Sequence, residues 1–184
     1  MHSVAIFGSI YMYMKKILFF LFVLIISTQA HAQNKYKVSL IGFYNLENLY
    51  DTVNNTMVDD EEFLPNSERH YNGRIYRDKL DRLASVISQM GTDINPDGLA
   101  ILGVAEIEND TVLTDLANTA LLKGRNLKFV HYNSPDRRGV DVAMFYNPKY
   151  FKPLHSEPLF VQLPGGSKES FFTRDILYVK GLLD

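Results

Sequence analysis

The chain has 184 residues, of which 46% are hydrophobic, so it is long enough to bury a substantial core as one domain. Its 19 basic and 21 acidic residues give a formal net charge of −2, which excludes the class of general nucleic-acid binders that rely on a basic surface. Because cysteine is absent, neither a disulfide nor a lipid-anchor cysteine is available.

Residues 1–32 have the pattern of an export signal. Met14-Lys-Lys supplies a positive start, an apolar run from Ile17 to Ile26 follows, and the segment up to Ala32 ends in Ala-His-Ala. We predict cleavage after Ala32, with Met14 as an alternative initiator. The apolar run is shorter than the roughly 20 residues that span a bilayer. The protein is therefore expected to be exported, to the periplasm or outside the cell, without a stable membrane anchor.

Two apolar runs predict strands that are each followed by a polar residue. The run from Tyr36 to Tyr44 precedes Asn45, and the run from Leu99 to Ala105 precedes Glu106. The second run has no polar alternation, which is typical of a strand covered on both faces. Ligands of α/β sheets bind beyond the carboxyl ends of such strands.

The segment between these strands predicts a long loop and then a helix. Asp51 to Asn72 is polar and has no sustained periodicity, so we expect a loop. From Arg74 to the stop at Gly91, apolar residues recur at steps of three and four, as on one face of an amphipathic helix. These residues are Tyr76, Leu80, Leu83, Ile87 and Met90. Strand, helix and strand together predict a βαβ-like unit.

The remaining segments predict one short helix and an excess of strands. Asn109 or Asp110 can cap a helix that runs to Leu122. Strands are expected at Asn126–Tyr132, Val140–Tyr146 and Phe171–Val179. The proline-broken segment Phe151–Leu163 is at best an edge strand.

Asn45 and Glu106 are the main candidates for a site. If their strands are neighbours, a carboxylate and an amide lie side by side at the rim of the sheet, which suits a hard cation and a phosphate. The alternatives are that Asn45 only turns the chain and that Glu106 is a solvated loop residue. Glu47 and Glu108 are interpreted as surface or helix-start charges.

Three stretches resemble the endonuclease/exonuclease/phosphatase superfamily, which includes pancreatic-type deoxyribonuclease, and its exported bacterial members above all. They are Phe43-Tyr-Asn-Leu-Glu-Asn-Leu49, Gly103-Val-Ala-Glu-Ile-Glu-Asn109 and Asp136-Arg-Arg-Gly-Val-Asp-Val-Ala-Met-Phe145. The segment Thr173-Arg-Asp-Ile-Leu177 is a further point of likeness. Their order and spacing resemble the N-terminal half of the family's domain, from about Val38 to the C-terminus, so residues 33–184 are expected to form the N-terminal part of such a domain.

The resemblance implies a fold and a reaction. The fold is an α/β four-layered sandwich, two packed β-sheets flanked by helices, of which this chain supplies about the first half. The reaction is hydrolysis of a phosphoester by water, assisted by Mg²⁺ or Mn²⁺, in which Asn45 matches the active-site asparagine and Glu106 the metal-binding glutamate. Arg137 and Arg138 are either phosphate-binding or only a solvated hairpin end.

The family completes its active site with an Asn-His pair, a Gly-Asp-x-Asn segment and a terminal Asp-His, none of which occurs in these 184 residues. His70, His131 and His155 do not stand in those contexts. We therefore expect the 184-residue chain to be inactive by itself, with a nucleic acid or a smaller phosphoester as the substrate of an intact enzyme. The rival interpretation is a non-catalytic binding or interaction module, although no feature indicates a protein partner.

Overall fold

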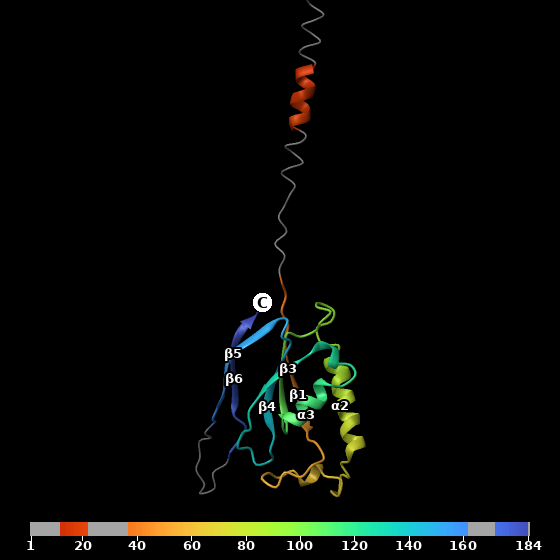
Figure 1. Ribbon diagram of the computed structural model, residues 1–184, viewed down its shortest axis with the longest axis vertical. Coiled ribbons are helices and arrows are strands. Elements are labelled where there is room, and N and C mark those ends of the chain that lie inside the picture. Colours follow the sequence, from red (N-terminus) through yellow and green to blue (C-terminus); the bar gives the residue numbers. More distant parts are fainter. Residues whose placement is uncertain (1–11, 22–36, 162–171, 184) are drawn as a thin grey trace, which may run out of the picture. The chain divides into compact units, whose positions relative to one another are not determined.

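The computed structural model describes residues 12–21, 37–161 and 172–183 (Figure 1). Contacts divide the chain into two compact units, Met1–Lys37 and Val38–Asp184. In the first unit, residues 12–21 form a helix, while the predicted cleavage point after Ala32 lies outside the described residues. Within the described part of the chain, no helix is both long enough and apolar enough to cross a bilayer.

The second unit is built on a four-stranded sheet with the order β1-β2-β4-β3. Its strands are β1 (Ile41–Leu49), β2 (Ile101–Ile107), β3 (Lys128–His131) and β4 (Asp141–Tyr146). β1 and β2 are parallel neighbours, as expected of strands joined by a helical crossover, and β4 runs antiparallel to both β2 and β3. The predicted βαβ unit is therefore present in the structure.

Two helices cover one face of this sheet. α2 (Gly73–Ile87) begins at Asn72, whose side chain accepts hydrogen bonds from two backbone N–H groups of the first turn, and α3 (Asp110–Ala117) begins at Asn109 in the same way. Both helices end earlier than the predicted stops at Gly91 and Leu122, and turns follow them. Their apolar faces bury the alternate side chains of the strands below in one core. That core includes Leu80, Leu83, Ile87, Leu102, Val104, Val112, Leu113, Leu116 and Phe145.

A two-stranded antiparallel sheet forms from the last part of the chain. Its strands are β5 (Phe151–Leu159) and β6 (Ile176–Leu183). The predicted edge strand within Phe151–Leu163 is present over Phe151–Leu159. β6 begins later and runs further than the predicted Phe171–Val179. Proline is tolerated in β5 because a two-stranded ribbon leaves one edge of each strand without a ladder partner.

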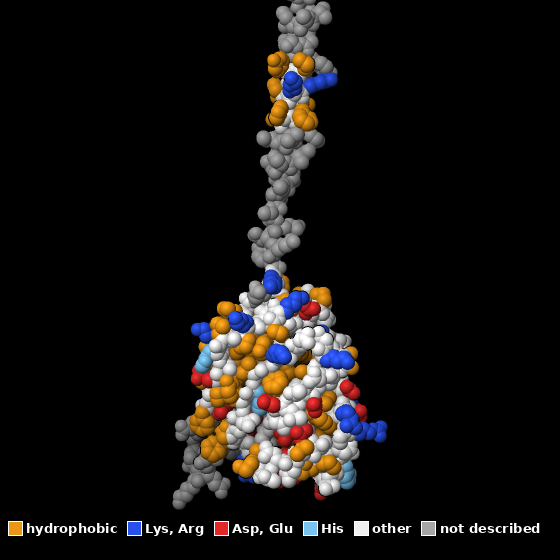
Figure 2. Space-filling view, viewed as in Figure 1, with side chains coloured by type: hydrophobic (Ala, Val, Ile, Leu, Met, Phe, Trp, Pro, Cys, Tyr) orange, Lys and Arg blue, Asp and Glu red, His pale blue; other side chains and the backbone are white. Residues whose placement is uncertain are grey.

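The two sheets and the helices make an α/β sandwich, as predicted. Figure 1 shows α2 on one side of the main sheet and the β5–β6 ribbon on the other. A cavity of about 430 Å³ lies between the sheets, lined by β1, β2, β4 and β6. Apolar side chains remain exposed on this side of the main sheet, Phe43 at 71%, and Figure 2 shows hydrophobic side chains on the surface among the strands.

The long loop at residues 51–72 is present as predicted, with a single 3-10 turn, η1 (Glu61–Phe63). It is held to the body of the domain by aromatic contacts. The ring of Phe63 stacks on Tyr50 with centroids 4.0 Å apart, and the Tyr71 hydroxyl donates a hydrogen bond of 2.9 Å to the Tyr50 carbonyl. The loop is therefore attached beside the end of β1.

Candidate metal and phosphate site

The neighbouring strands β1 and β2 are both bulged close to their carboxyl ends. Asn45 pairs with Ala105 and Leu49 pairs with Ile107, so three residues of β1 face the single residue Glu106 of β2. Glu47, Asn48 and Glu106 have φ values of 52°, 60° and 63°, in the left-handed region. Such bulges redirect side chains and are frequent next to active sites.

Glu106 is redirected by its bulge toward the second sheet. Regular alternation would place it with Val104 on the helix-covered face, but its Oε1 atom lies 3.6 Å from Nη1 of Arg174, which precedes β6. The Glu106 side chain is 19% exposed and that of Arg174 is 29% exposed. Glu106 thus belongs to β2 rather than following it, and its carboxylate is half-buried beside a cation.

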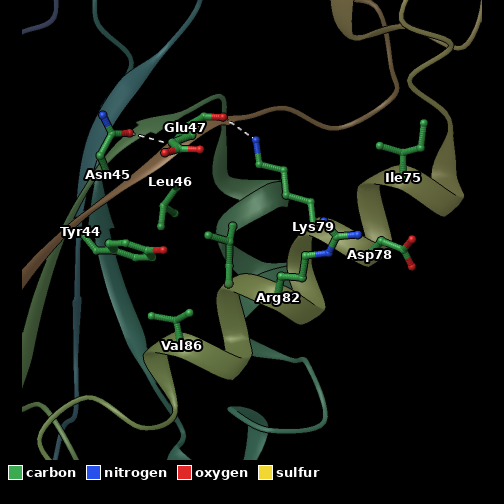
Figure 3. A pocket seen from close by; sticks show the side chains of 10 residues that line it. Tyr44, Asn45, Leu46, Glu47, Ile75, Asp78, Lys79, Arg82 and Val86 are labelled. Atoms are coloured by element: carbon green, nitrogen blue, oxygen red, sulfur yellow. Dashed lines mark hydrogen bonds between the residues drawn. The ribbon is translucent and has the colours of Figure 1, made fainter.

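Asn45 lies within β1 and not beyond it, because pairing with β2 resumes at Leu49 after the bulge. By alternation it shares the outer face of the sheet with Phe43. Its Oδ1 atom accepts a hydrogen bond of 2.8 Å from the Glu47 N–H, and its carboxamide nitrogen points away from Glu47 (Figure 3). The structure therefore brings Asn45 and Glu106 to the same end of two adjacent strands.

A groove of about 470 Å³ lies between the end of β1 and α2 (Figure 3). Lys79 of α2 lies along it and donates hydrogen bonds from Nζ to the carbonyls of Glu47 (2.5 Å) and Asn48 (2.8 Å). Burial lowers the pKa of the Lys79 ammonium, while the charges of Glu47 and Glu106 oppose that shift. The Lys79 ammonium thus lies at the bulge of β1, in a groove that Glu47, Asp78 and Arg82 also line.

The two predicted phosphate-binding arginines are each paired with a carboxylate. Arg137 contacts Asp59 of the long loop at 2.6 Å, and Arg138 contacts Asp136 at 3.0 Å. The pKa of Arg138 is raised by its hydrogen bond to Asp136, and the charge of Glu106 also contributes to the shift. The charge of Glu106 therefore acts on two arginines, Arg138 and Arg174.

Glu108 is buried, contrary to its interpretation as a surface or helix-start charge. Its Oε2 atom accepts a hydrogen bond of 2.7 Å from the Asp51 N–H at the start of the long loop. Burial is the main cause that raises its pKa to about 7. Glu108 thus anchors the loop, whereas Glu47 is exposed at the groove.

His131 is buried between two aspartates. Its Nδ1 atom lies 2.7 Å from Asp110 and its Nε2 atom 3.1 Å from Asp141. These contacts join β3 to α3 and to β4, which is a structural arrangement. His70 and His155 are exposed, and across residues 12–21, 37–161 and 172–183 no group of three or more His, Asp, Glu or Cys side chains is arranged to hold a metal ion.

A comparison with protein families matches residues 40–184 to the endonuclease/exonuclease/phosphatase family. The chain belongs to this family. The resemblance seen in the sequence is confirmed, and the α/β sandwich is the architecture expected of an endonuclease/exonuclease/phosphatase domain. Comparisons with curated proteins and with solved structures gave no match.

Members of the endonuclease/exonuclease/phosphatase family are generally hydrolases, and divalent metals are common among them. The chain therefore carries a hydrolase scaffold of the nuclease and phosphatase type. Two residues at its candidate site were missed from sequence. Lys79 looked like one more polar residue of an amphipathic helix, and Arg174 was noted only as a likeness, because its partner Glu106 is far away along the chain.

Proposed function

We propose that the protein is an exported hydrolase of phosphoesters that depends on Mg²⁺ or Mn²⁺, with the metal held at Glu106 and Asn45. The observation that supports the proposal is the bulge that turns the Glu106 carboxylate out of the helix-covered face, in the strand next to that of Asn45. Bulges that redirect a side chain in this way are frequent next to active sites.

The donor set fits such an ion. Mg²⁺ prefers oxygen ligands and is commonly held by one or two carboxylates with several waters retained. Glu106 offers one carboxylate that is partly open to solvent, and Asn45 offers an amide oxygen in the neighbouring strand. A bound divalent cation would neutralise the negative charge that develops on the phosphoryl oxygens during hydrolysis.

The surrounding side chains have separate tasks in this proposal. The Asn45 carboxamide nitrogen is directed to donate to a phosphoryl oxygen. Arg138 and Arg137 bind phosphate, in exchange for the carboxylates that they contact in the structure. Arg174 balances the charge of Glu106 while no cation is bound. The substrate class is a nucleic acid or a smaller phosphoester.

The 184 residues contain none of the histidine and aspartate motifs with which the family completes its site. We therefore propose that this polypeptide by itself binds the metal but does not turn substrate over. Export is the second part of the proposal, and mass spectrometry of the exported protein should show an N-terminus at Gln33. An N-terminus at Met1 or Met14 in mature protein would contradict it.

The activity test compares Glu106→Gln with wild type in the intact enzyme. The substrates are DNA and a synthetic phosphodiester, each assayed with Mg²⁺ or Mn²⁺. Glu106→Gln keeps the shape and removes the charge, so the rate should collapse and recover only partly with excess metal. Glu108→Gln is the matched control, because this neighbouring carboxylate binds the loop backbone. Full activity of Glu106→Gln at low metal would refute the assignment, and metal-independent substrate binding without turnover would favour a binding module.

A further inference from the structure

The end of β1 holds an unfavourable backbone conformation that needs support. Glu47 and Asn48 are consecutive residues with φ values of 52° and 60°. Residues with side chains rarely adopt left-handed backbone, and they persist there only where the surrounding structure holds them. Hydrogen bonds from outside the strand are the simplest way to hold such a turn.

Lys79 supplies hydrogen bonds of this kind from the neighbouring helix. Its Nζ atom donates to the carbonyls of both left-handed residues, at 2.5 Å to Glu47 and 2.8 Å to Asn48, and Figure 3 shows the side chain extended along the groove toward them. α2 itself is fixed by its buried face, which includes Leu80 and Leu83. Lys79 therefore connects the turn to a rigid element.

The Glu47–Asn48 turn is connected to both candidate metal ligands, Asn45 and Glu106. The N–H of Glu47 donates to Oδ1 of Asn45, so the position of this N–H sets the direction of the carboxamide. The same turn is the part of β1 that faces Glu106 across the ladder, because pairing is interrupted between Asn45 and Leu49. A shift of the turn would move the Asn45 carboxamide directly and would disturb the part of the ladder opposite Glu106.

We propose that Lys79 is a positioning residue of the metal site, which holds the Glu47–Asn48 turn and thereby orients Asn45 and Glu106. The inference rests on the proposed function, in which Glu106 binds a divalent cation. It makes a prediction opposite in sign to that of simple charge repulsion. A lysine that only sits near the cation weakens its binding, whereas a lysine that positions the ligands strengthens it.

The test measures Mn²⁺ affinity by electron paramagnetic resonance in wild type, Lys79→Met, Lys79→Arg and Arg82→Met. Lys79→Met should bind Mn²⁺ about 10-fold more weakly, the effect expected when a residue that supports a metal ligand is lost. Lys79→Arg should recover most of the affinity because it can still donate to the carbonyls. Arg82 lines the same groove but, among the described residues, donates no hydrogen bond to the turn, so Arg82→Met should bind at least as tightly as wild type.

A nuclear magnetic resonance experiment on the metal-free protein tests the positioning directly. In Lys79→Met, the Glu47 amide should exchange with solvent at least about 10-fold faster and the Asn45 carboxamide resonances should move, while the amides of α2 stay protected. Unchanged resonances, or Mn²⁺ affinity equal to or tighter than wild type, would overturn the role of Lys79. Failure of the wild type to bind Mn²⁺ would instead overturn the proposed function itself, and the metal role of Lys79 with it.

Discussion

The contact of His131 with two aspartates predicts a stability effect that separates a structural histidine from a catalytic one. The His131 side chain is 3% exposed, and it contacts Asp141, which is equally buried, and Asp110, which is 72% exposed. Asp141 also accepts hydrogen bonds from the backbone and the hydroxyl of Ser134. The two sides of the histidine therefore differ in their access to water.

This asymmetry sets the expected magnitudes. Removing one partner of a buried ion pair costs about 3–5 kcal/mol of the free energy of unfolding, because the other charge is left buried. An exposed ion pair contributes about 0–1 kcal/mol. Asp141→Asn should thus destabilise the domain by several kcal/mol, and Asp110→Asn by less than about 1 kcal/mol.

The pH dependence follows from the protonation of the ring. Burial lowers the pKa of His131, but the hydrogen bonds to Asp141 and Asp110 outweigh it, so the pKa lies above the ordinary value of 6.5. A histidine whose pKa is higher in the folded than in the unfolded protein stabilises the folded state. The stabilisation is complete at pH values below the pKa in the unfolded protein, and it is lost as the pH rises through the pKa in the folded protein. His131→Leu should therefore cost more stability near pH 5.5 than near pH 9.

The assay is urea unfolding of the three variants and wild type at both pH values, followed by circular dichroism. Mn²⁺ affinity is measured alongside and should be unchanged in His131→Leu, because the ring lies among structural carboxylates. Equal costs for Asp110→Asn and Asp141→Asn would show that burial does not distinguish the two contacts, and a cost of His131→Leu that grows with pH would show that the buried ring is not held protonated.

Three further predictions concern stability and surface. Gly139 has φ +66° and a Cβ there would lie 2.6 Å from Val58, so Gly139→Ala should lower the free energy of unfolding by about 1–2 kcal/mol, measured by thermal unfolding. Gly103→Ala should lower it by less, because the nearest neighbour of Gly103 is the exposed, movable ring of Phe43. Equal losses of stability in the two variants would contradict this. The raised pKa of Glu108, about 7, means that stability falls as the pH rises from about 4.5 to about 7, so Glu108→Gln should be more stable than wild type at pH 8, by up to about 3 kcal/mol; no gain would contradict the burial argument. Phe43→Ser should reduce the fluorescence of a bound hydrophobic dye while changing the free energy of unfolding by less than about 1 kcal/mol, and unchanged fluorescence would place the dye elsewhere.

Much of the fold was predictable because hydrophobic periodicity encodes both the type of an element and the face that it buries. The apolar run before Glu106 identified a central strand, and the three- and four-residue steps from Tyr76 to Ile87 identified the helix that covers it. The ends of elements were less predictable. α3 stops at Ala117, five residues before the predicted end, because turn hydrogen bonds replace the helical ones there.

The candidate site was predictable only in part. Asn45 and Glu106 could be placed from strand order, but nothing in the sequence signals left-handed backbone at Glu47 or Glu106, since neither is a glycine. The contacts that complete the site join residues distant in the chain, such as Lys79 to the Glu47–Asn48 turn. Such contacts depend on packing between elements, which local sequence patterns do not determine.

The most direct measurement is anomalous diffraction at the manganese edge from crystals of the protein soaked in Mn²⁺. We expect a peak at bonding distance from the Glu106 carboxylate, roughly 2.1 Å for an ion of the Mg²⁺ type, with Asn45 beside it. The peak should be absent in Glu106→Gln and present in Glu108→Gln. A Glu106 carboxylate that still contacts Arg174, with no peak beside it at saturating Mn²⁺, would rule out Glu106 as a metal ligand.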